Sequence, residues 1–204
     1  MIWVGDESKC PHKWIQTWQD NHPDWAFRLW GNKELNDFDW RTKKQMGQFI
    51  EKGYWAGVAD CMRYEILFDQ GGVYADADST SLKPLDDFLL HADLFAAYEN
   101  EVQRPGLITN AFIGSVPGNP ILKELIERIS KQRNINCLWT WKPPFYKNRR
   151  PWRTSGPKPF TREINKKRQY ATIWPSILFI PQHFLEKKIR KKNISYADHY
   201  SNPQ

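Results

Sequence analysis

A helical segment of this chain leads through two glycines into a short strand and a pair of aspartates, and few folds accommodate that order. Residues 56–70 have the length and apolar content of a helix, which Gly71-Gly72 ends. Residues 73–76, with Val73 and Tyr74, are typical of a strand. A helix followed directly by a strand indicates an α/β protein, in which ligands bind beyond the carboxyl ends of the strands.

The rest of the 204 residues alternates in the same way and shows no domain boundary. We therefore predict a single α/β domain over residues 1–204, with a mainly parallel central sheet and helices on both faces. The expected strands cover 2–4, 25–30, 73–76, 94–98, 111–114 and 172–174. The expected helices cover 11–21, 41–52, 56–70 and 119–131.

Charge is divided unevenly along the chain. Residues 1–130 hold 13 Lys and Arg against 20 Asp and Glu, whereas residues 131–204 hold 17 against 3. The basic part contains a Trp- and Pro-rich stretch, about 138–159, that we expect to be an irregular loop, and a basic C-terminal segment, 187–204. Such a distribution indicates an anionic ligand near the basic part, although a solvated basic face fits it equally well.

Several protein classes are disfavoured. Three widely spaced cysteines with no Cys-x-x-Cys pair argue against a disulfide framework or a zinc knuckle, and Cys61 is expected to be a small buried residue. No apolar run is long enough for a transmembrane segment, and no signal peptide is visible. These features predict a cytoplasmic protein of a reducing compartment.

The aspartates that follow the strand are the best candidates for chemistry. Residues two apart in a strand point to the same side, so Asp76 and Asp78 would present both carboxylates to one place. Paired carboxylates together with substrate phosphates suit Mg²⁺ or Mn²⁺. The second Asp-x-Asp pair, Asp37-Phe38-Asp39, follows no strand and is interpreted as a solvated loop or a helix cap.

The helix before the strand carries a second pair. Asp60 and Arg63 lie three residues apart and share a face, while Glu65 and Asp69 cluster on the opposite face, where we expect them to meet water. Asp60 and Arg63 then point into the fold or into a cleft. Both a structural salt bridge and a substrate-binding pair are consistent with this spacing.

Taken together, these residues resemble a known family. Residues 55–81 contain the pattern Ala59-x-x-x-Arg63-Tyr64, Leu67, Gly71-Gly72-Val73-Tyr74-x-Asp76-x-Asp78, which resembles the sugar-binding region of family-32-like DXD glycosyltransferases. That group includes yeast-type α-1,6-mannosyltransferases and clostridial glucosylating toxins, and a glycosyltransferase domain of algal viruses is similar. Weaker similarities lie at Ile2-Trp3-Val4-Gly5, at residues 21–25, 110–112 and 118–120, at Ser155-Gly156-Pro157, and at Ala197-Asp198-His199.

The resemblance implies a GT-A, Rossmann-like fold and a set of site residues. It assigns the metal, Mn²⁺ or Mg²⁺, to Asp76, Asp78 and His199, and the donor sugar to Asp60 and Arg63, so that Asp60, Arg63, Asp76 and Asp78 form the expected catalytic group. It further implies substrate contacts from the residues Trp3, which would stack on the base, Val4, Tyr74, Asn110 and Gly156. Trp3 could equally be a core residue, since large aromatic side chains also fill cores.

The activity implied by the resemblance is hexose transfer, with retention, from a nucleotide-sugar to a glycan or another hydroxyl acceptor. A lone tryptophan over the base favours a UDP-sugar such as UDP-glucose, for example in polysaccharide biosynthesis, and GDP-mannose is the alternative. The cations Lys142, Arg149, Arg150, Arg153 and Lys158 are candidates for stabilising the leaving diphosphate. Trp139, Trp141 and Trp152 are either an acceptor platform or loop anchors.

Two other classes compete with this hypothesis. Basic residues interleaved with aromatics, as in residues 139–153, also suit single-stranded nucleic acid, but no nucleic-acid-binding motif is present and the acidic half would repel a phosphate backbone. We therefore expect no nucleic-acid partner. A lectin-like binder without turnover is the third possibility, and only an assay separates it from an enzyme.

Overall fold

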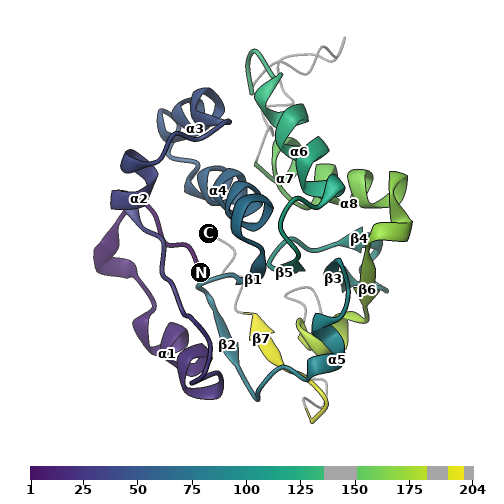
Figure 1. Cartoon of the computed structure of the whole chain (residues 1–204). Coiled ribbons are helices and arrows are strands. Elements are labelled where there is room, and N and C mark those ends of the chain that lie inside the picture. The colour runs from purple at the N-terminus through teal and green to yellow at the C-terminus, as the bar shows by residue number, and fades with distance from the viewer. Residues whose placement is uncertain (136–150, 183–192, 200–204) are drawn as a thin grey trace.

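The structure is a computed structural model that describes residues 1–135, 151–182 and 193–199 (Figure 1). Its helices in these ranges are α1 (His12–Asn21), α2 (Asn32–Asp37), α3 (Lys43–Ile50), α4 (Trp55–Gln70), α5 (Asp87–Leu90), α6 (Pro120–Ser130), α7 (Pro151–Thr154) and α8 (Pro157–Lys166). Its strands are β1 (Gly72–Ala75), β2 (Ser79–Ser81), β3 (Leu94–Asn100), β4 (Arg104–Ile108), β5 (Phe112–Ser115), β6 (Thr172–Trp174) and β7 (Ala197–His199).

Helix α4 lies inside the molecule and aims the chain at the candidate site. It packs against α3, α6 and α7, and most of its side chains are buried, which explains its weak amphipathic pattern (Figure 1). Gly71 ends it at φ 69°, where its amide donates to the Leu67 carbonyl. A side chain at Gly71 would also meet the Pro117 ring at 2.7 Å. The predicted helix, glycine stop and strand are thus confirmed.

The main sheet has five strands, and its pairing corrects one prediction. β1 pairs with β5, β5 with β3, and β3 with β4, all antiparallel, and β6 pairs with β3 in parallel. The prediction of a mainly parallel sheet was therefore wrong for the described strands. Only residues 101–103 join β3 to β4, and only residues 109–111 join β4 to β5. A parallel pair needs a crossover of a dozen residues or more, so β3 and β4, joined by residues 101–103 alone, pair antiparallel. β5 runs in the same direction as β4 after its short link and also pairs antiparallel with β3.

Both faces of this sheet are covered. One core joins Tyr74, Ala96 and Ile113 to α4, α6 and α8, and the other joins Ala75 and Phe112 to side chains of α1, α5 and the segment before residue 182. Neighbouring residues of one strand, such as Tyr74 and Ala75, belong to different cores, as the two-residue period of a strand requires. The predicted α/β class with helices on both faces is confirmed.

Other predictions were less accurate. The expected strands 2–4 and 25–30 are reduced to a single parallel bridge between Ile2 and Trp30. The stretch 138–159 is not all loop, because α7 and the start of α8 lie in it, each with a proline in its first turn, where the missing amide is tolerated. Residues 136–150 and most of the basic segment 187–204 lie outside the described residues. In the described parts, no helix is long and apolar enough to cross a membrane.

Candidate active site

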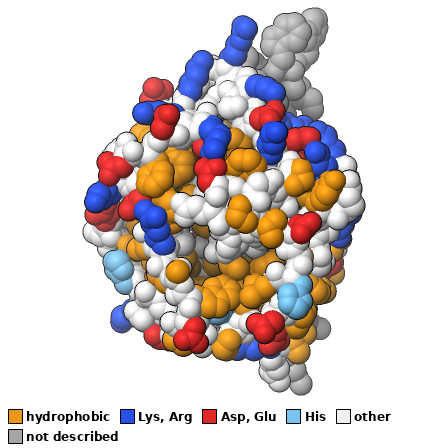
Figure 2. Space-filling model, in the orientation of Figure 1, with side chains coloured by type: hydrophobic (Ala, Val, Ile, Leu, Met, Phe, Trp, Pro, Cys, Tyr) orange, Lys and Arg blue, Asp and Glu red, His pale blue; other side chains and the backbone are white. Residues whose placement is uncertain are grey.

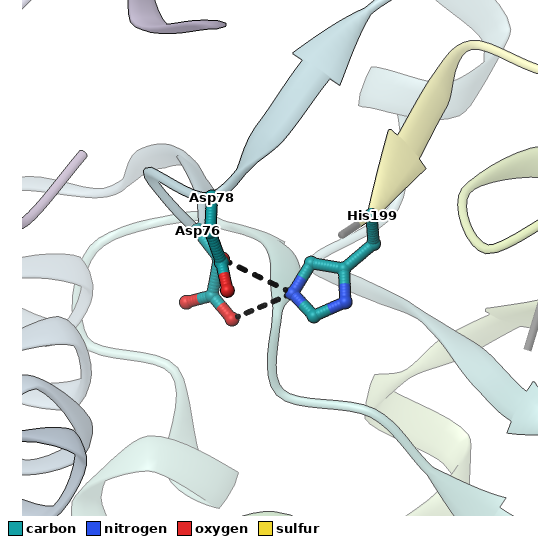
Figure 3. Close-up of side chains that lie close together, drawn as sticks. All are labelled: Asp76, Asp78 and His199. Atoms are coloured by element: carbon teal, nitrogen blue, oxygen red, sulfur yellow. Dashed lines mark hydrogen bonds and ion pairs between the residues drawn. The ribbon is translucent and has the colours of Figure 1, made fainter. Parts of the chain in front are cut away.

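A turn and a separate strand bring together three side chains that could hold a metal ion. Asp76 and Asp78 lie in the turn between β1 and β2, and His199 is the last residue of β7. β2 and β7 pair antiparallel with Ser79 opposite His199, which places the imidazole beside the turn. His199 Nε2 lies 3.3 Å from Asp76 Oδ2 and 3.2 Å from Asp78 Oδ1, and all three side chains point toward one another (Figure 3).

The chemistry of this donor set fits a divalent cation. One ligand atom from each of Asp76, Asp78 and His199 can be chosen so that all lie within 4.8 Å of one another. Two carboxylates and one imidazole suit Mn²⁺ well, and the carboxylates also suit Mg²⁺. The Asp78 side chain is 41% exposed, against 12% for His199, so the site opens to solvent on the Asp78 side. An open side leaves room for oxygen ligands from a substrate.

The electrostatics show why a cation belongs here. Burial alone would lower the pKa of His199, but its hydrogen bonds to Asp76 and Asp78 raise that pKa to about 10. Burial would raise the pKa of Asp76, yet Arg63 and His199 together hold it below its usual value. A protonated imidazole therefore supplies the positive charge between the two carboxylates in this arrangement.

Arg63 is held directly beneath the carboxylate pair. Its Nη1 donates to the Asn110 carbonyl at 2.6 Å and lies 3.0 Å from Asp76 Oδ1. Its guanidinium carbon also lies 4.4 Å from the centre of the Tyr74 ring, while the Tyr74 hydroxyl donates to Asp76 Oδ1 at 2.6 Å. Asp76 is thus fixed from two sides, and Arg63 is buried, at 5% exposed.

Asp60 lies deeper, in a hydrogen-bonded group of its own. Its Oδ1 accepts from Asn110 Nδ2 at 2.7 Å and lies 3.4 Å from Arg63 Nη2. Its Oδ2 accepts from Ser155 Oγ at 2.9 Å. The Tyr64 hydroxyl accepts from the same Asn110 amide and donates to the Ser155 carbonyl. Burial raises the pKa of Asp60, against the opposing effect of Arg63.

The remaining predicted substrate-binding residues lie at different depths. Tyr74 and Asn110 are buried beside Asp76 and Asp60, as described above. A side chain at Gly156 would come within 3.3 Å of Asp60 Oδ2, so this backbone lies against the Asp60 group. The Val4 side chain packs in the core. Trp3 is partly exposed, and its indole nitrogen donates to the Asp6 carbonyl. Base stacking by Trp3 stays a prediction, as does substrate contact by Val4.

Two expectations about neighbouring residues need correction or addition. Glu65 does not face water: it is 2% exposed and accepts from the amides of Arg41 and Thr42 and from the Thr42 hydroxyl. Asp69 is exposed and pairs with Arg41. Tyr64 and Ser155 complete the Asp60 group and were not predicted for the site. Both residues stand in the stretches that resemble the family, but their contact spans 91 residues, and helical spacing alone does not predict it.

Of the five predicted diphosphate-stabilising cations, Lys142, Arg149 and Arg150 lie outside the described residues. Arg153 and Lys158 are described, and both lie over the Trp152 ring, with Lys158 Nζ 4.4 Å from its centre. Trp152 lies in α7, and a side chain at Gly156 would meet both its α-carbon and Asp60 Oδ2, so this part of α7 lies near the Asp60 group in space. No described contact joins Arg153 or Lys158 to Asp76 or Asp78.

Comparison with known proteins agrees with this geometry. Residues 9–95 match the family described as "Glycosyltransferase sugar-binding region containing DXD motif". The matched region contains Asp60, Arg63, Asp76 and Asp78. The predicted resemblance to DXD glycosyltransferases is confirmed. The match agrees with the glycosyltransferase class of enzyme predicted from the same residues.

Individual relatives support the same family. The chain is 28% identical over 155 residues to an initiation-specific alpha-1,6-mannosyltransferase of Candida albicans, covering 61% of this chain and 39% of that protein. It is 29% identical over 134 residues to inositol phosphoceramide mannosyltransferase 3 of Schizosaccharomyces pombe, covering 61% and 35%. The chain thus spans less than half the length of these relatives. The solved PaToxG glycosyltransferase shares the fold, with a TM-score of 0.63 at 18% identity over 82% of this chain and 68% of that chain.

Proposed function

We propose that this chain transfers a hexose from a nucleotide-sugar to a hydroxyl of a glycan acceptor, in a reaction that depends on a divalent metal and retains the anomeric configuration. The observation that carries the proposal is the convergence of Asp76, Asp78 and His199 above the buried pair Asp60 and Arg63. A carboxylate pair open to solvent and backed by a buried cation is suited to holding a metal and a diphosphate next to a sugar.

The three residues at the opening would hold Mn²⁺ or Mg²⁺. When bound, the ion supplies positive charge to the diphosphate that leaves as the glycosidic bond breaks. Arg63 and the Tyr74 hydroxyl hold Asp76 in one orientation, so the carboxylate needs little rearrangement on binding. Such preorganisation is the main way in which an enzyme lowers the barrier for a step that develops charge.

In this proposal the Asp60 carboxylate accepts a hydrogen bond from the donor sugar. An ionised carboxylate has about four acceptor positions. Asn110 and Arg63 approach Oδ1 and Ser155 approaches Oδ2. One position on Oδ2 is thus left for a donor-sugar hydroxyl. The same contacts hold the carboxylate in one orientation. In this proposal the Asp60–Arg63 pair therefore has both a structural role and a substrate-binding role.

For the donor, we propose a nucleotide-activated mannose such as GDP-mannose. The relatives described above are named mannosyltransferases, and this favours mannose over the glucose suggested by a single tryptophan near the base. Trp3 would stack on the base in either case, because its partly exposed ring can present a face to any base.

The test is a donor panel read out by released nucleotide and by product. GDP-mannose, UDP-glucose and UDP-galactose are offered with a mannose acceptor, with Mn²⁺ or with EDTA. The proposal predicts product from GDP-mannose with Mn²⁺, loss of at least 100-fold with EDTA or in Asp78→Asn, and an α-anomeric product by NMR. Donor binding without any turnover would instead support a lectin-like binder, and no binding of any donor would contradict the proposal.

A further inference from the structure

A second concave site lies between β4, α7 and α8, away from the carboxylates. Its volume is about 950 Å³, at the upper end of the range for small-molecule sites. Its lining includes six cationic side chains and no Asp or Glu among the described residues: Arg104, Arg128, Arg153, Lys158, Arg162 and Lys166. We call these six residues and Trp152 the basic cleft. Figure 2 shows Lys and Arg side chains gathered over α6 and α8, next to this region.

The charge in the cleft is only partly neutralised. The Glu163 side chain, which is 2% exposed, forms ion pairs with three of the cations. Its carboxylate oxygens lie 3.0 Å from nitrogens of Arg128 and Arg162 and 2.8 Å from Lys166 Nζ. Arg104 pairs with Glu99 at 3.2 Å. Within the described residues, no carboxylate lies within ion-pair distance of Arg153 or Lys158. The cleft therefore keeps a clear positive excess.

Three cations of the cleft lie close together over the Trp152 ring. Lys158 Nζ lies 4.4 Å from its ring centre, and the guanidinium carbons of Arg104 and Arg153 lie at 5.3 and 5.8 Å. A cation over an aromatic ring is attracted to it, which offsets part of the repulsion between like charges. An anion seated between these cations would remove the rest of that repulsion. The ring therefore prearranges the three cations for an anionic ligand.

The cleft also connects to the proposed sugar site through the backbone. Gly156 follows α7, and a side chain there would come within 2.8 Å of the Trp152 α-carbon and within 3.3 Å of Asp60 Oδ2. Trp152 and the Asp60 carboxylate thus flank the same glycine. A ligand in the cleft would lie one layer of backbone away from the group that we assign to the donor sugar.

We propose that the basic cleft binds the phosphate groups of a phosphorylated oligosaccharide, which would serve as the acceptor. The volume exceeds what a single inorganic anion fills, and the several cations suit more than one charged group. The acceptor role rests on the proposed function. Binding of the phosphorylated sugar in the cleft does not depend on the proposed function, because it uses none of the residues Asp60, Arg63, Asp76, Asp78 or His199.

The test measures binding by fluorescence anisotropy with three labelled probes: a phosphorylated pentamannose, the same pentamannose without phosphate, and the oligonucleotide dT10. The wild type should bind the phosphorylated sugar at least 10-fold more tightly than the neutral one, and more tightly than dT10. Arg153→Gln/Lys158→Gln should lose at least 10-fold, while Lys43→Gln/Lys44→Gln, which removes two exposed cations from α3, should keep wild-type affinity.

The remaining outcomes separate this proposal from the proposed function. Equal affinity for the phosphorylated and neutral sugars, or equal losses in the two double variants, would overturn it. Tighter binding of dT10 would also overturn it, in favour of a nucleic-acid surface. Asp78→Asn should bind the phosphorylated sugar like the wild type. If no donor is ever bound but the phosphorylated sugar still is, the transferase proposal fails and the cleft stands.

Discussion

Arg63 Nη1 lies 3.0 Å from Asp76 Oδ1, so the first aspartate of the candidate metal site is tied to the helix that precedes its strand. Both side chains belong to one continuous stretch, with α4, the two glycines and β1 in sequence. The ion pair therefore links the most buried helix of the molecule to the edge at which the proposed chemistry occurs. Changes in α4 should affect stability and metal binding together.

Arg63→Met should strongly destabilise the fold. It removes the partner of the partly buried Asp76, the donor to the Asn110 carbonyl and the cation next to the buried Asp60. Breaking a buried ion pair in this way lowers the free energy of unfolding by about 3–5 kcal/mol. Urea unfolding measures this change in the free energy of unfolding. Lys131→Met, which removes an exposed pair with Glu127, should cost less than about 0.5 kcal/mol. Comparable losses in both variants would contradict the assignment.

Two glycines should respond to alanine in opposite directions. At Gly156 the new methyl group would lie 2.8 Å from the Trp152 α-carbon and 3.3 Å from Asp60 Oδ2, so Gly156→Ala should lower stability by about 1–3 kcal/mol and weaken donor binding. Gly47 lies within α3, and a methyl group there meets nothing within 4 Å. Gly47→Ala should therefore raise stability by about 0.5–1 kcal/mol. Thermal melts give both values, and a neutral Gly156→Ala would show that the turn is looser than described.

Alkaline pH should reduce stability through Tyr196. Burial, together with the hydrogen bond to Asp86, raises the pKa of Tyr196 to about 12. In the unfolded chain this hydroxyl loses its proton near pH 10, so the folded state holds the proton more strongly. The free energy of unfolding should accordingly fall as the pH rises from about 10 to 12. Tyr196→Phe should flatten the fall, whereas Tyr170→Phe, at an exposed position, should not. Equal slopes in all three proteins would refute this.

Two cysteines should differ sharply toward a thiol reagent. Cys61 is 1% exposed, and burial raises its pKa far above the usual value, so little reactive thiolate forms in the folded protein. Cys10 is partly exposed, and burial raises its pKa less. In a Cys137→Ser background at pH 8, Cys10 should be modified at least 100-fold faster than Cys61. Mass spectrometry of the labelled peptides decides this, and rapid labelling of Cys61 would mean that α4 opens readily.

Local features of the site could be predicted from the sequence. The helix at 56–70 ends at glycines that adopt φ values of 69° and 95°, and the aspartates follow the strand as their spacing indicated. Helical spacing placed Asp60 and Arg63 on one face of the helix, where both are buried, and Cys61 is buried as predicted. In each case residues close in the sequence determine the geometry.

Features that depend on distant segments could not be predicted. Strand direction depends on which strands become neighbours, and the short links 101–103 and 109–111 show their effect only once β3, β4 and β5 are known. Glu65 was expected to meet water because helical spacing considers one helix by itself. In the structure the Arg41–Thr42 segment covers that face of the helix. Helices α7 and α8 were not predicted, because the prolines in their first turns made the stretch resemble a loop.

Titration of Mn²⁺ in the presence of GDP-mannose, followed by EPR, measures whether Asp76, Asp78 and His199 hold a divalent cation. Asp78→Asn should weaken Mn²⁺ binding at least 10-fold without unfolding the protein, because the Asp78 side chain is 41% exposed. His199→Ala should also weaken it. Asp39→Asn, in the other Asp-x-Asp pair, is the matched control. Asp39→Asn should bind Mn²⁺ with the affinity of the wild type. Equal Mn²⁺ affinity in Asp78→Asn and Asp39→Asn would show that Asp78 is not a metal ligand.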